Sequence, residues 1–517
     1  MLALRQPKIN RGQKAVPVAV TAPVGGWNAR DGFDDMDPTD ATVLDNWFPS
    51  FGKVSVRFGS SAYANTLGGG VKMLAEFLAG SSRKFIAGAN GNIWDISSTG
   101  AGVSLASGYG ADNWQTAQFD DSSGGARMGL VNGTDAPQQY NGTAVSAMTI
   151  SGTGLTTSTL NGIHIHKSRS YFWDSRTQDY WYSATNSLGG VLTKFPMGRV
   201  QGTGGNMLAM GTWSHDAGSG LGDYAVFVLS SGDVLVYSGS DPSSATDWAL
   251  VGRYNIGAPI AKEAIKKIGS ELLLVTKAGY VPISSMVKGG QYNDQASSIS
   301  SKIRGAALSA TSMYSANNGW QVLHYPSQNM LIVNVPTSTT VFYQHVMNTE
   351  TKAWCRFKGL NATVWGLYND AAYYGTTAGT VLKFDPTATS DNGTAIDADA
   401  QTAWTYLGDR RRAKRATAVR FNFATTGAAL SGSFGVGFDY KTIGLSAFQI
   451  AGTSASSPWD TSDWDTTSWG DESISQTGWY SAHGNGYVLA SRIRLQSSTT
   501  GADWYSTTYL VEPGGIL

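Results

Sequence analysis

The sequence predicts an all-β protein: a β-propeller of about six to eight blades, an additional C-terminal β domain and an extended N-terminal arm. Three observations predict this class. Charged residues make up 14% of the 517 residues, against about 25% in typical soluble proteins, while Gly (63), Tyr (23) and Trp (17) are abundant. Apolar and aromatic runs flank short Gly, Asn, Ser or Asp turns, which is the pattern of β-hairpins. Long runs with a helical 3.6-residue period are missing from the sequence.

The hairpins recur at nearly regular intervals along the chain. Their turns follow one another at steps of about 42 to 54 residues, which matches the periods of propeller blades. Further strand-like runs between them give roughly four strands per repeat, as in a blade. A pair of β-sandwiches with evenly spaced turns stays open as an alternative. The predicted hairpins cover residues 85–96, 128–140, 171–183, 226–238, 272–284, 320–335 and 372–384.

Four regions follow from these patterns. Residues 1–26 are basic, contain no acidic residue and are expected to form the arm; residues 27–70 form an N-terminal motif region. Residues 71–386 are expected to form the propeller and 387–517 a separate β platform or dock domain. Two short helices are also expected: one over 37–48, with Asp37 as N-cap, and one over 260–273 between blades.

Composition narrows the possible functions. Lys plus Arg and Asp plus Glu are both 37, so the basic excess of a dedicated nucleic-acid binder is missing. A single cysteine, Cys355, forms no internal disulfide. We find no apolar run of 18 or more residues, and the N-terminal apolar stretch is too short for a signal peptide. We therefore expect synthesis in a cytoplasm and no membrane insertion.

Signatures of catalysis are missing from the sequence. Nucleophile-elbow, zinc-protease, P-loop and dinucleotide-binding motifs do not occur, although a glycosidase site needs only two carboxylates and leaves no signature. We expect no enzyme, no cofactor and no metal site. His164 and His166 alternate on a predicted strand and so share one face, but zinc requires three or four ligands. A hydrogen-bonded structural pair is the favoured interpretation.

Two segments are candidate interfaces. The first is a basic run that could bind phosphates or an acidic partner, or form a charged strand edge that discourages aggregation. Protein interface or strand edge is favoured over nucleic acid, since no aromatic residues interleave with it. The run consists of Arg410, Arg411, Arg412, Lys414 and Arg415.

The second segment places Trp459, Trp464 and Trp469 five residues apart, with aspartates between them. Flat indole rings suit a sugar platform, and the aspartates suggest a calcium loop, but the EF-hand spacing fails. Packing on a neighbouring subunit or domain is favoured, because buried aromatic residues anchor interfaces.

Residues 25–64 resemble the opening of the tail nozzle proteins of short-tailed bacteriophages, the tail tubular protein B family. In that family Gly-Gly-x-Asn precedes an Ala/Leu/Asn segment and a Pro-x-x-Gly-x-x-x-x-Arg-x-Gly stretch. Segments 230–257, 348–357 and 459–469 are also similar. The matching residues here are Gly25, Gly26, Asn28, Ala41, Leu44, Asn46, Pro49, Gly52, Arg57 and Gly59.

The resemblance implies a structural protein of the virion tail, made in the host cytoplasm. Six copies would form the distal tube, join the portal-side adaptor ring, contact tail fibres or spikes, and pass double-stranded DNA without sequence-specific binding. A near-neutral composition suits such a conduit, because a strongly basic wall would retain DNA. The alternative is a carbohydrate-binding propeller, either a phage receptor-binding protein or a lectin, which the tryptophans motivate.

Overall fold

The computed structural model describes residues 15–122, 124–199, 204–216, 221–289, 298–426, 430–450, 474–476 and 478–516. The chain divides into two compact units. One contains residues 58–352 and 356–393; the other contains residues 1–57, 353–355 and 394–517. The first is a β-propeller and the second a β-sandwich, so the all-β fold class predicted from the sequence is confirmed.

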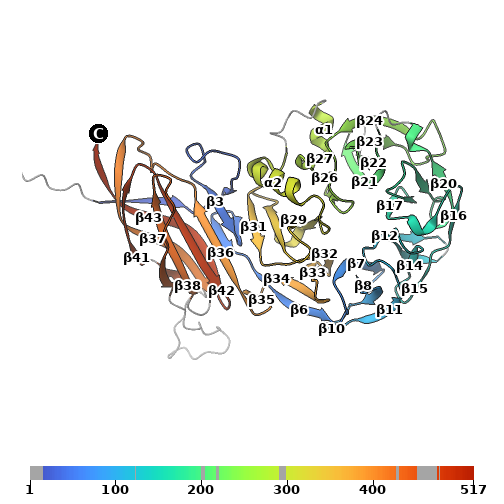
Figure 1. The fold of residues 1–517 in the computed structure, drawn as a ribbon, viewed down its shortest axis with the longest axis horizontal. Helices are drawn as coiled ribbons and strands as arrows, with labels where there is room; N and C mark the ends of the chain where they lie inside the picture. Colours follow the sequence, from blue (N-terminus) through green and yellow to red (C-terminus); the bar gives the residue numbers. More distant parts are fainter. Residues whose placement is uncertain are drawn as a thin grey trace, which may run out of the picture. The chain divides into compact units, whose positions relative to one another are not determined.

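The propeller has seven blades (Figure 1). Each innermost strand contacts the innermost strand of the next blade, and the seventh contacts the first, so the ring is closed. The inner strands are β7 (Val71–Ala79), β12 (Gln115–Asp121), β17 (Gly162–His166), β21 (Met207–Asp216), β25 (Ile265–Ile268), β28 (Gln321–Tyr325) and β32 (Val364–Tyr368).

Antiparallel strands extend each blade outward from its inner strand. The first blade adds β8 (Ser82–Ala89), β9 (Asn92–Asp95) and β11 (Val103–Ser107), and the second adds β13 (Gly125–Val131), β14 (Gln138–Tyr140) and β15 (Val145–Ala147). The third adds β18 (Arg169–Trp173), β19 (Tyr180–Tyr182) and β20 (Gly190–Phe195), and β16 (Ile150–Gly152) pairs parallel with β20. The fourth adds β22 (Leu221–Leu229), β23 (Asp233–Ser238) and β24 (Ala249–Asn255).

The last three blades differ in their outer strands. Among the described residues, the fifth has only β26 (Glu271–Thr276) and β27 (Gly279–Pro282) beyond its inner strand. Helix α2 (Arg304–Tyr314) contacts β27, and α1 (Ile283–Gly289) follows β27 in sequence. The sixth has β29 (Met330–Pro336), β30 (Phe342–Asn348) and β31 (Trp354–Lys358), although Trp354 and Cys355 of β31 are grouped with the sandwich unit. The seventh has β33 (Ala371–Gly375), β34 (Val381–Asp385) and then β6 (Gly59–Asn65), beside the short β10 (Gly100–Ala101) and β35 (Ser390–Asp391).

Strand β6 closes the ring, because a strand that precedes the first blade in sequence completes the last one. It pairs antiparallel with β34, with Phe384 opposite Ser60 and Asp385 opposite Gly59. Six of the seven predicted hairpins are the second and third strands of a blade, and the hairpin over 320–335 is the first and second strands of the sixth blade. Its different place in the blade explains part of the unequal spacing.

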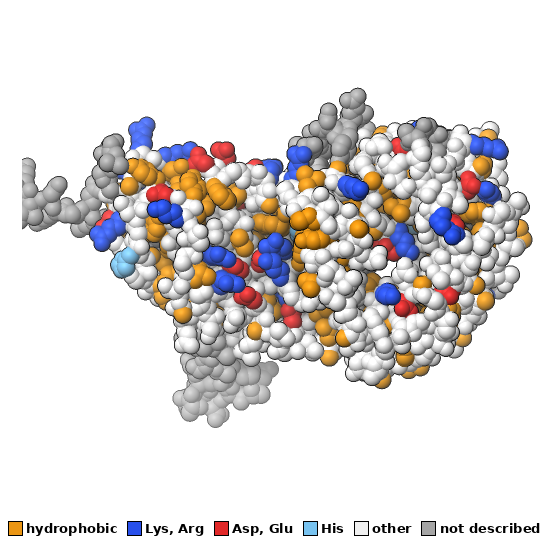
Figure 2. All heavy atoms as spheres, in the orientation of Figure 1, with side chains coloured by type: hydrophobic (Ala, Val, Ile, Leu, Met, Phe, Trp, Pro, Cys, Tyr) orange, Lys and Arg blue, Asp and Glu red, His pale blue; other side chains and the backbone are white. Residues whose placement is uncertain are grey.

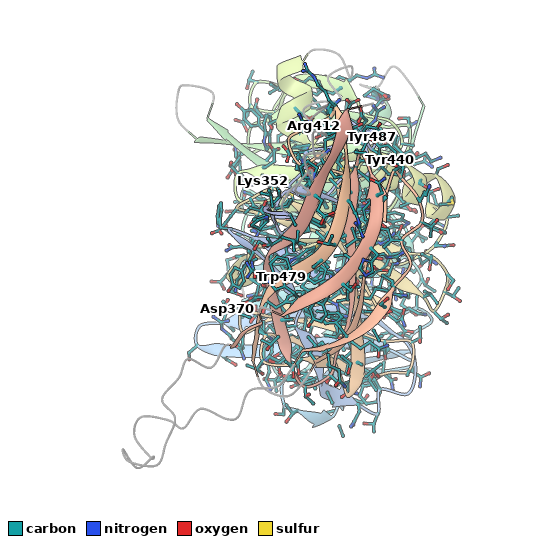
Figure 3. All side chains as sticks on the ribbon, turned by 90° about the vertical axis from the view of Figure 1, so that its left-hand side faces the viewer. Lys352, Asp370, Arg412, Tyr440, Trp479 and Tyr487 are labelled. Carbon is teal, nitrogen blue, oxygen red and sulfur yellow. The ribbon has the colours of Figure 1, made fainter. Side chains whose placement is uncertain are left out.

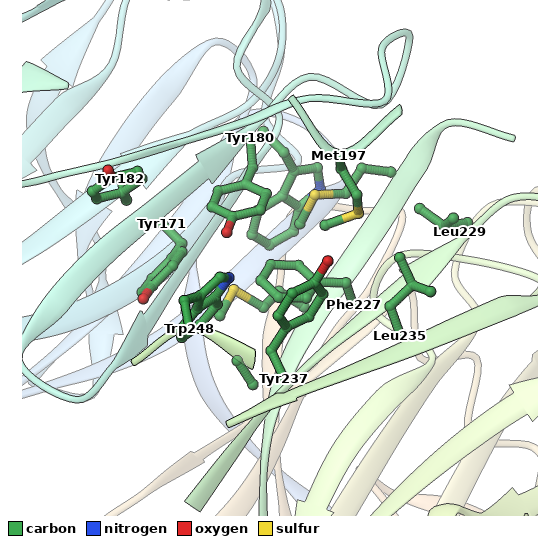
Figure 4. Packing of buried hydrophobic residues seen from close by; sticks show 13 residues of the cluster. Tyr171, Tyr180, Tyr182, Met197, Phe227, Leu229, Leu235, Tyr237 and Trp248 are labelled. Atoms are coloured by element: carbon green, nitrogen blue, oxygen red, sulfur yellow. The ribbon is translucent and has the colours of Figure 1, made fainter. Parts of the chain in front are cut away.

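Aromatic side chains fill the spaces between blades. Between the third and fourth blades, Tyr180 stacks on Phe227 with ring centroids 4.8 Å apart, and Tyr237 stacks on Trp248 at 5.3 Å (Figure 4). Such pairs add about 0.5–1.5 kcal/mol each beyond the burial of their area. The high Trp and Tyr content of the sequence therefore serves blade packing.

The β-sandwich combines segments from both ends of the chain. Its first sheet contains β1 (Val16–Thr21), β4 (Trp47–Ser50), β5 (Lys53–Val56), β43 (Gly501–Ile516), β37 (Arg412–Thr426), β40 (Ile474–Gln476) and β41 (Trp479–Gly486). Its second sheet contains β2 (Gly26–Trp27), β3 (Asp40–Asp45), β36 (Thr394–Thr402), β42 (Leu489–Ser497), β38 (Leu430–Phe438) and β39 (Ser446–Ile450). Phe421 of the first sheet contacts Phe434 of the second, with centroids 5.4 Å apart.

The predicted region boundaries differ from those in the structure. The motif region 27–70 is not separate: residues up to 57 belong to the sandwich, and those from 58 onward belong to the propeller. The arm expected over residues 1–26 includes strand β1, which pairs along its whole length with β43; residues 1–14 lie outside the described residues. The sequence could not show this pairing because β1 and β43 lie at opposite ends of the chain.

Both predicted helices are wrong. Residues 40–45 form β3, which pairs with β36, and the Asp37 carboxylate accepts a hydrogen bond from the Thr39 amide in a local turn. Residues 265–268 and 271–276 form the hairpin of β25 and β26, with the turn at Gly269 (φ +60°). In both segments strand pairing and burial outweigh a local helix-start signal, as tertiary context often does.

Candidate functional sites

The basic run lies at the start of β37, and the strand-edge interpretation of it is wrong. Strand β37 has neighbours on both sides: Lys414 is opposite Pro513 of β43 and Gly486 of β41. Because Lys414 and Arg415 have partners on both sides, they protect no free edge, and Arg410 and Arg411 precede the strand. The sequence could not show this, because both neighbours come from the last 40 residues of the described chain.

Most of the basic run is already paired. Arg410 contacts Asp34 at 3.5 Å, Arg412 contacts Asp409 at 3.8 Å, and Arg415 contacts Glu512 at 3.5 Å. The Lys414 side chain is different, because the residue is only 4% exposed. Its ammonium group donates to the backbone carbonyls of residues 409, 412 and 487, and desolvation lowers the pKa of Lys414.

Arg411 has no acidic side-chain partner among the described residues; only its backbone amide bonds the Asp409 carboxylate. A run in which three of five cations contact carboxylates and a fourth is buried has little charge left for phosphates. Figure 2 shows the same intermixing, with basic and acidic side chains next to each other rather than gathered into separate regions. This arrangement favours a protein interface over a nucleic-acid interface.

An exposed aromatic cluster adjoins Arg410, and sequence reasoning missed it. We call Phe33, Asp34, Tyr406, Arg410 and Tyr440 the Phe33 cluster. Phe33 is 54% exposed and stacks on Tyr440, itself 42% exposed, at 6.2 Å between ring centroids. The Arg410 guanidinium lies 4.5 Å from the Tyr406 ring centroid. Figure 3 looks onto the sandwich and labels Tyr440.

Hydrogen bonds to one carboxylate organise the Phe33 cluster. The Tyr406 hydroxyl donates to the Asp34 carboxylate at 2.6 Å, and the Tyr440 hydroxyl donates to the same oxygen at 3.1 Å. The Tyr406 hydrogen bond is the main cause that lowers the pKa of Asp34, and desolvation raises the pKa of Tyr440. A signal existed in the sequence, because Phe33 is a large apolar residue in a Gly- and Asp-rich loop.

The family-like segment is built from residues with definite structural roles. Gly26 has φ +86°, and a Cβ there would lie 2.7 Å from the backbone nitrogen of Trp354. Asn46 (φ +59°) accepts a hydrogen bond from the Arg57 guanidinium at 2.9 Å and donates to the Asp397 carbonyl at 2.8 Å. The buried Asn28 donates to Asp40 at 2.8 Å. These residues fix the path of residues 25–59.

The remaining residues that the sequence analysis singled out are three tryptophans and two histidines. Trp459, Trp464 and Trp469 lie outside the described residues. His164 Nε2 and His166 Nδ1 each lie 3.0 Å from the Thr212 hydroxyl, as expected for a structural pair, but the buried His166 Nε2 has no hydrogen-bond partner among the described residues. Desolvation is the main cause that lowers both histidine pKa values to about 4. In the described part of the chain, no three His, Cys, Asp or Glu side chains gather as a metal site would require.

The propeller contains a cavity of about 1090 Å³. It lies where the inner strands begin, because its walls come from the first residues of these strands and the loops before them. Its charged side chains are Lys72, Asp112, Lys262, Glu263, Lys266 and Lys267. Sequence reasoning missed this site, since three of the lysines lie in the segment expected to be a helix.

Comparisons with known proteins found only distant structural similarity. No protein-family model matches the chain, and no curated protein matches its sequence. The computationally designed Ika8 protein is similar at 13% identity over 62% of this chain and 99% of its own, with a TM-score of 0.35. YCF48, solved bound to D1 peptide, is similar at 12% identity over 68% and 98%, with a TM-score of 0.36.

A third similar structure is Raptor from Chaetomium thermophilum, at 10% identity over 63% of this chain and 28% of its own, with a TM-score of 0.39. Among the described residues, no helix has the length and apolar character needed to cross a membrane.

Proposed function

We propose that this chain is a non-catalytic structural protein of a short-tailed phage tail, which assembles as the hexameric nozzle at the distal end. In this role it binds the adaptor ring and the fibres or spikes, and DNA passes through the assembled tube. The proposal rests on the resemblance of residues 25–64 to the nozzle family. The protein would act in the virion tail after synthesis in the host cytoplasm.

One observation carries the proposal furthest: the family-like segment itself supplies part of an exposed aromatic surface. Buried residues of this segment, such as Asn28 and Asn46, fix its path, and the loop between β2 and β3 presents Phe33 and Asp34. Aromatic residues and arginine are the residue types that contribute most to protein interfaces. The Phe33 cluster therefore suits contact with another subunit or with the adaptor ring.

The partly neutralised basic run supports the same role. Arg410 belongs to the Phe33 cluster, and its contacts with Asp34 and Tyr406 hold the guanidinium in a defined place. An ordered arginine loses less side-chain entropy on binding than a free one. This arrangement fits a specific protein contact better than a sliding contact with DNA.

The first experiment locates the chain on virus particles. Antibody raised against this chain should label the end of a short tail in electron micrographs of particles from a lysate, with six-fold features in end views. Label that is absent from particles, or confined to peripheral fibres, contradicts the proposal. The carbohydrate-binding alternative then comes first, and binding of the purified protein to a glycan array tests it.

A second experiment tests the Phe33 cluster. Particles assembled without this chain are incubated with purified wild-type protein, and bound protein is measured by the same antibody. Phe33→Ser should weaken binding by about tenfold or more, as loss of an interface anchor does. Phe51→Ser is the matched control, because Phe51 is also exposed (74%) in the sandwich and lies in the turn between β4 and β5. Equal binding by both variants excludes the Phe33 cluster as the contact.

A further inference from the structure

The propeller cavity has a positive charge that the overall composition does not explain. Four lysines and two acids line it, although the whole chain has a net charge of zero. The lining also includes His164, whose lowered pKa of about 4 keeps it neutral near pH 7. The cavity therefore concentrates cationic side chains inside a neutral protein.

Both acidic side chains of the cavity, Asp112 and Glu263, already contact a lysine. Lys72 contacts Asp112 at 3.5 Å, and the Asp112 carboxylate also accepts a hydrogen bond from the Gly91 amide. Lys262 contacts Glu263 at 3.6 Å. The third lysine, Lys267, donates to the Ser214 hydroxyl at 2.7 Å, an uncharged partner.

Lys266 has no hydrogen-bond or ion-pair partner among the described residues. Its side chain is open to the solvent of the cavity, but the walls desolvate its ammonium group, and this lowers the pKa of Lys266. Its positive charge also contributes to the lowered pKa of His324, although desolvation is the larger cause there. An anion bound beside Lys266 would raise the lowered pKa values of Lys266 and His324, because a nearby negative charge stabilises the protonated form of each side chain.

The chemistry of the walls indicates the class of ligand. The described lining contains four lysines and no arginine, so an anion would meet compact ammonium charges, and lysine binds phosphate as such a point charge. Asn113, Gln115 and Asn318 also line the cavity and supply amide groups for hydroxyl partners. The volume of about 1090 Å³ leaves room for a small organic molecule.

We propose that the propeller cavity binds a small phosphorylated ligand with a polar body, and that Lys266 is the main contact of the phosphate group. Lys267 and Lys262 add to the positive field, and the amide side chains bind the body of the ligand. The site lies within one chain and does not depend on the assembly into a tail.

Isothermal titration calorimetry with glycerol phosphate tests the proposal, with glycerol as the uncharged probe. Wild-type protein should bind one glycerol phosphate per chain and no glycerol. Lys266→Gln should weaken binding by about tenfold or more, as loss of a charged hydrogen bond does. Lys277→Gln is the matched control, because Lys277 lies in the same blade, is exposed and does not line the cavity. Its affinity should equal that of the wild type.

A second measurement uses the wild-type protein, so its result does not depend on whether a variant folds. Glycerol phosphate should slow the acetylation of Lys266 by a small acylating reagent, followed by mass spectrometry, and should leave the rate at Lys277 unchanged. Absence of binding at millimolar glycerol phosphate, or equal affinity of Lys266→Gln and the wild type, overturns the proposal.

Discussion

Acid should destabilise the propeller through the pair His164 and His166. Each imidazole has a pKa of about 4 in the folded protein, against an ordinary value of 6.5, and desolvation is the main cause. A base whose pKa is depressed on folding binds more protons in the unfolded chain between these two values. The free energy of unfolding therefore rises with pH between about 4 and 6.5 and falls when the solution is acidified through this window.

The magnitude follows from the pKa difference. At pH 5 an unfolded-state pKa of 6.5 and a folded-state pKa of about 4 give a loss of about 2 kcal/mol for each histidine relative to neutral pH. The two rings share the Thr212 hydroxyl, so protonating one opposes protonating the other, and the pair together loses about 4 kcal/mol.

The assay compares urea unfolding at pH 7 and pH 5, followed by tryptophan fluorescence, for wild type and the double variant His164→Gln, His166→Asn. Gln places its amide near the position of Nε2 and Asn near Nδ1, so both retain a hydrogen bond to Thr212 without titrating. The variant should lose about 4 kcal/mol less than the wild type on acidification. His483→Gln, at an exposed site on β41, is the control and should behave as wild type.

If the double variant keeps the acid sensitivity of the wild type, the histidine pair does not cause it, and the reasoning from desolvation is refuted.

Two further substitutions test the sandwich by thermal unfolding. Gly26→Ala should destabilise it by about 2 kcal/mol or more, because Gly26 has a positive φ and the new Cβ would collide with Trp354; Gly444→Ala has open space and should change little. A small effect at Gly26 would contradict the tight fit. Lys414→Met should cost about 1–3 kcal/mol, since backbone carbonyls lose their donor, whereas Arg411→Gln should stay within about 0.5 kcal/mol. Equal stability of these two variants would argue against a structural role for Lys414.

Local patterns in the sequence were sufficient for the blades. Hairpin turns such as those at Gly91 and Gly232, where φ is positive, depend on a few neighbouring residues, so a short window of sequence reveals them. The alternation of His164 and His166 on one strand likewise placed both rings on one face. Their partner Thr212 lies on another blade and could not be predicted.

Pairing between distant segments was decided only by the tertiary structure. Residues 37–48 have local features of a helix, yet the distant strand β36 pairs with residues 41–45 of this segment. Residues 265–268 instead form a local hairpin with β26, and the closing of the ring of blades around it places Lys266 on a cavity wall rather than on a helix surface.

The N-terminal region shows the same division. The sequence by itself determined that the protein is all-β and that its hairpins repeat at the spacing of propeller blades, since turn chemistry and composition are local properties. Only the tertiary structure decided that β6 closes the ring, that β1 joins β43, and that Phe33 meets Tyr440. These contacts join residues hundreds of positions apart, and their energy comes from burial and strand pairing that a local pattern does not encode.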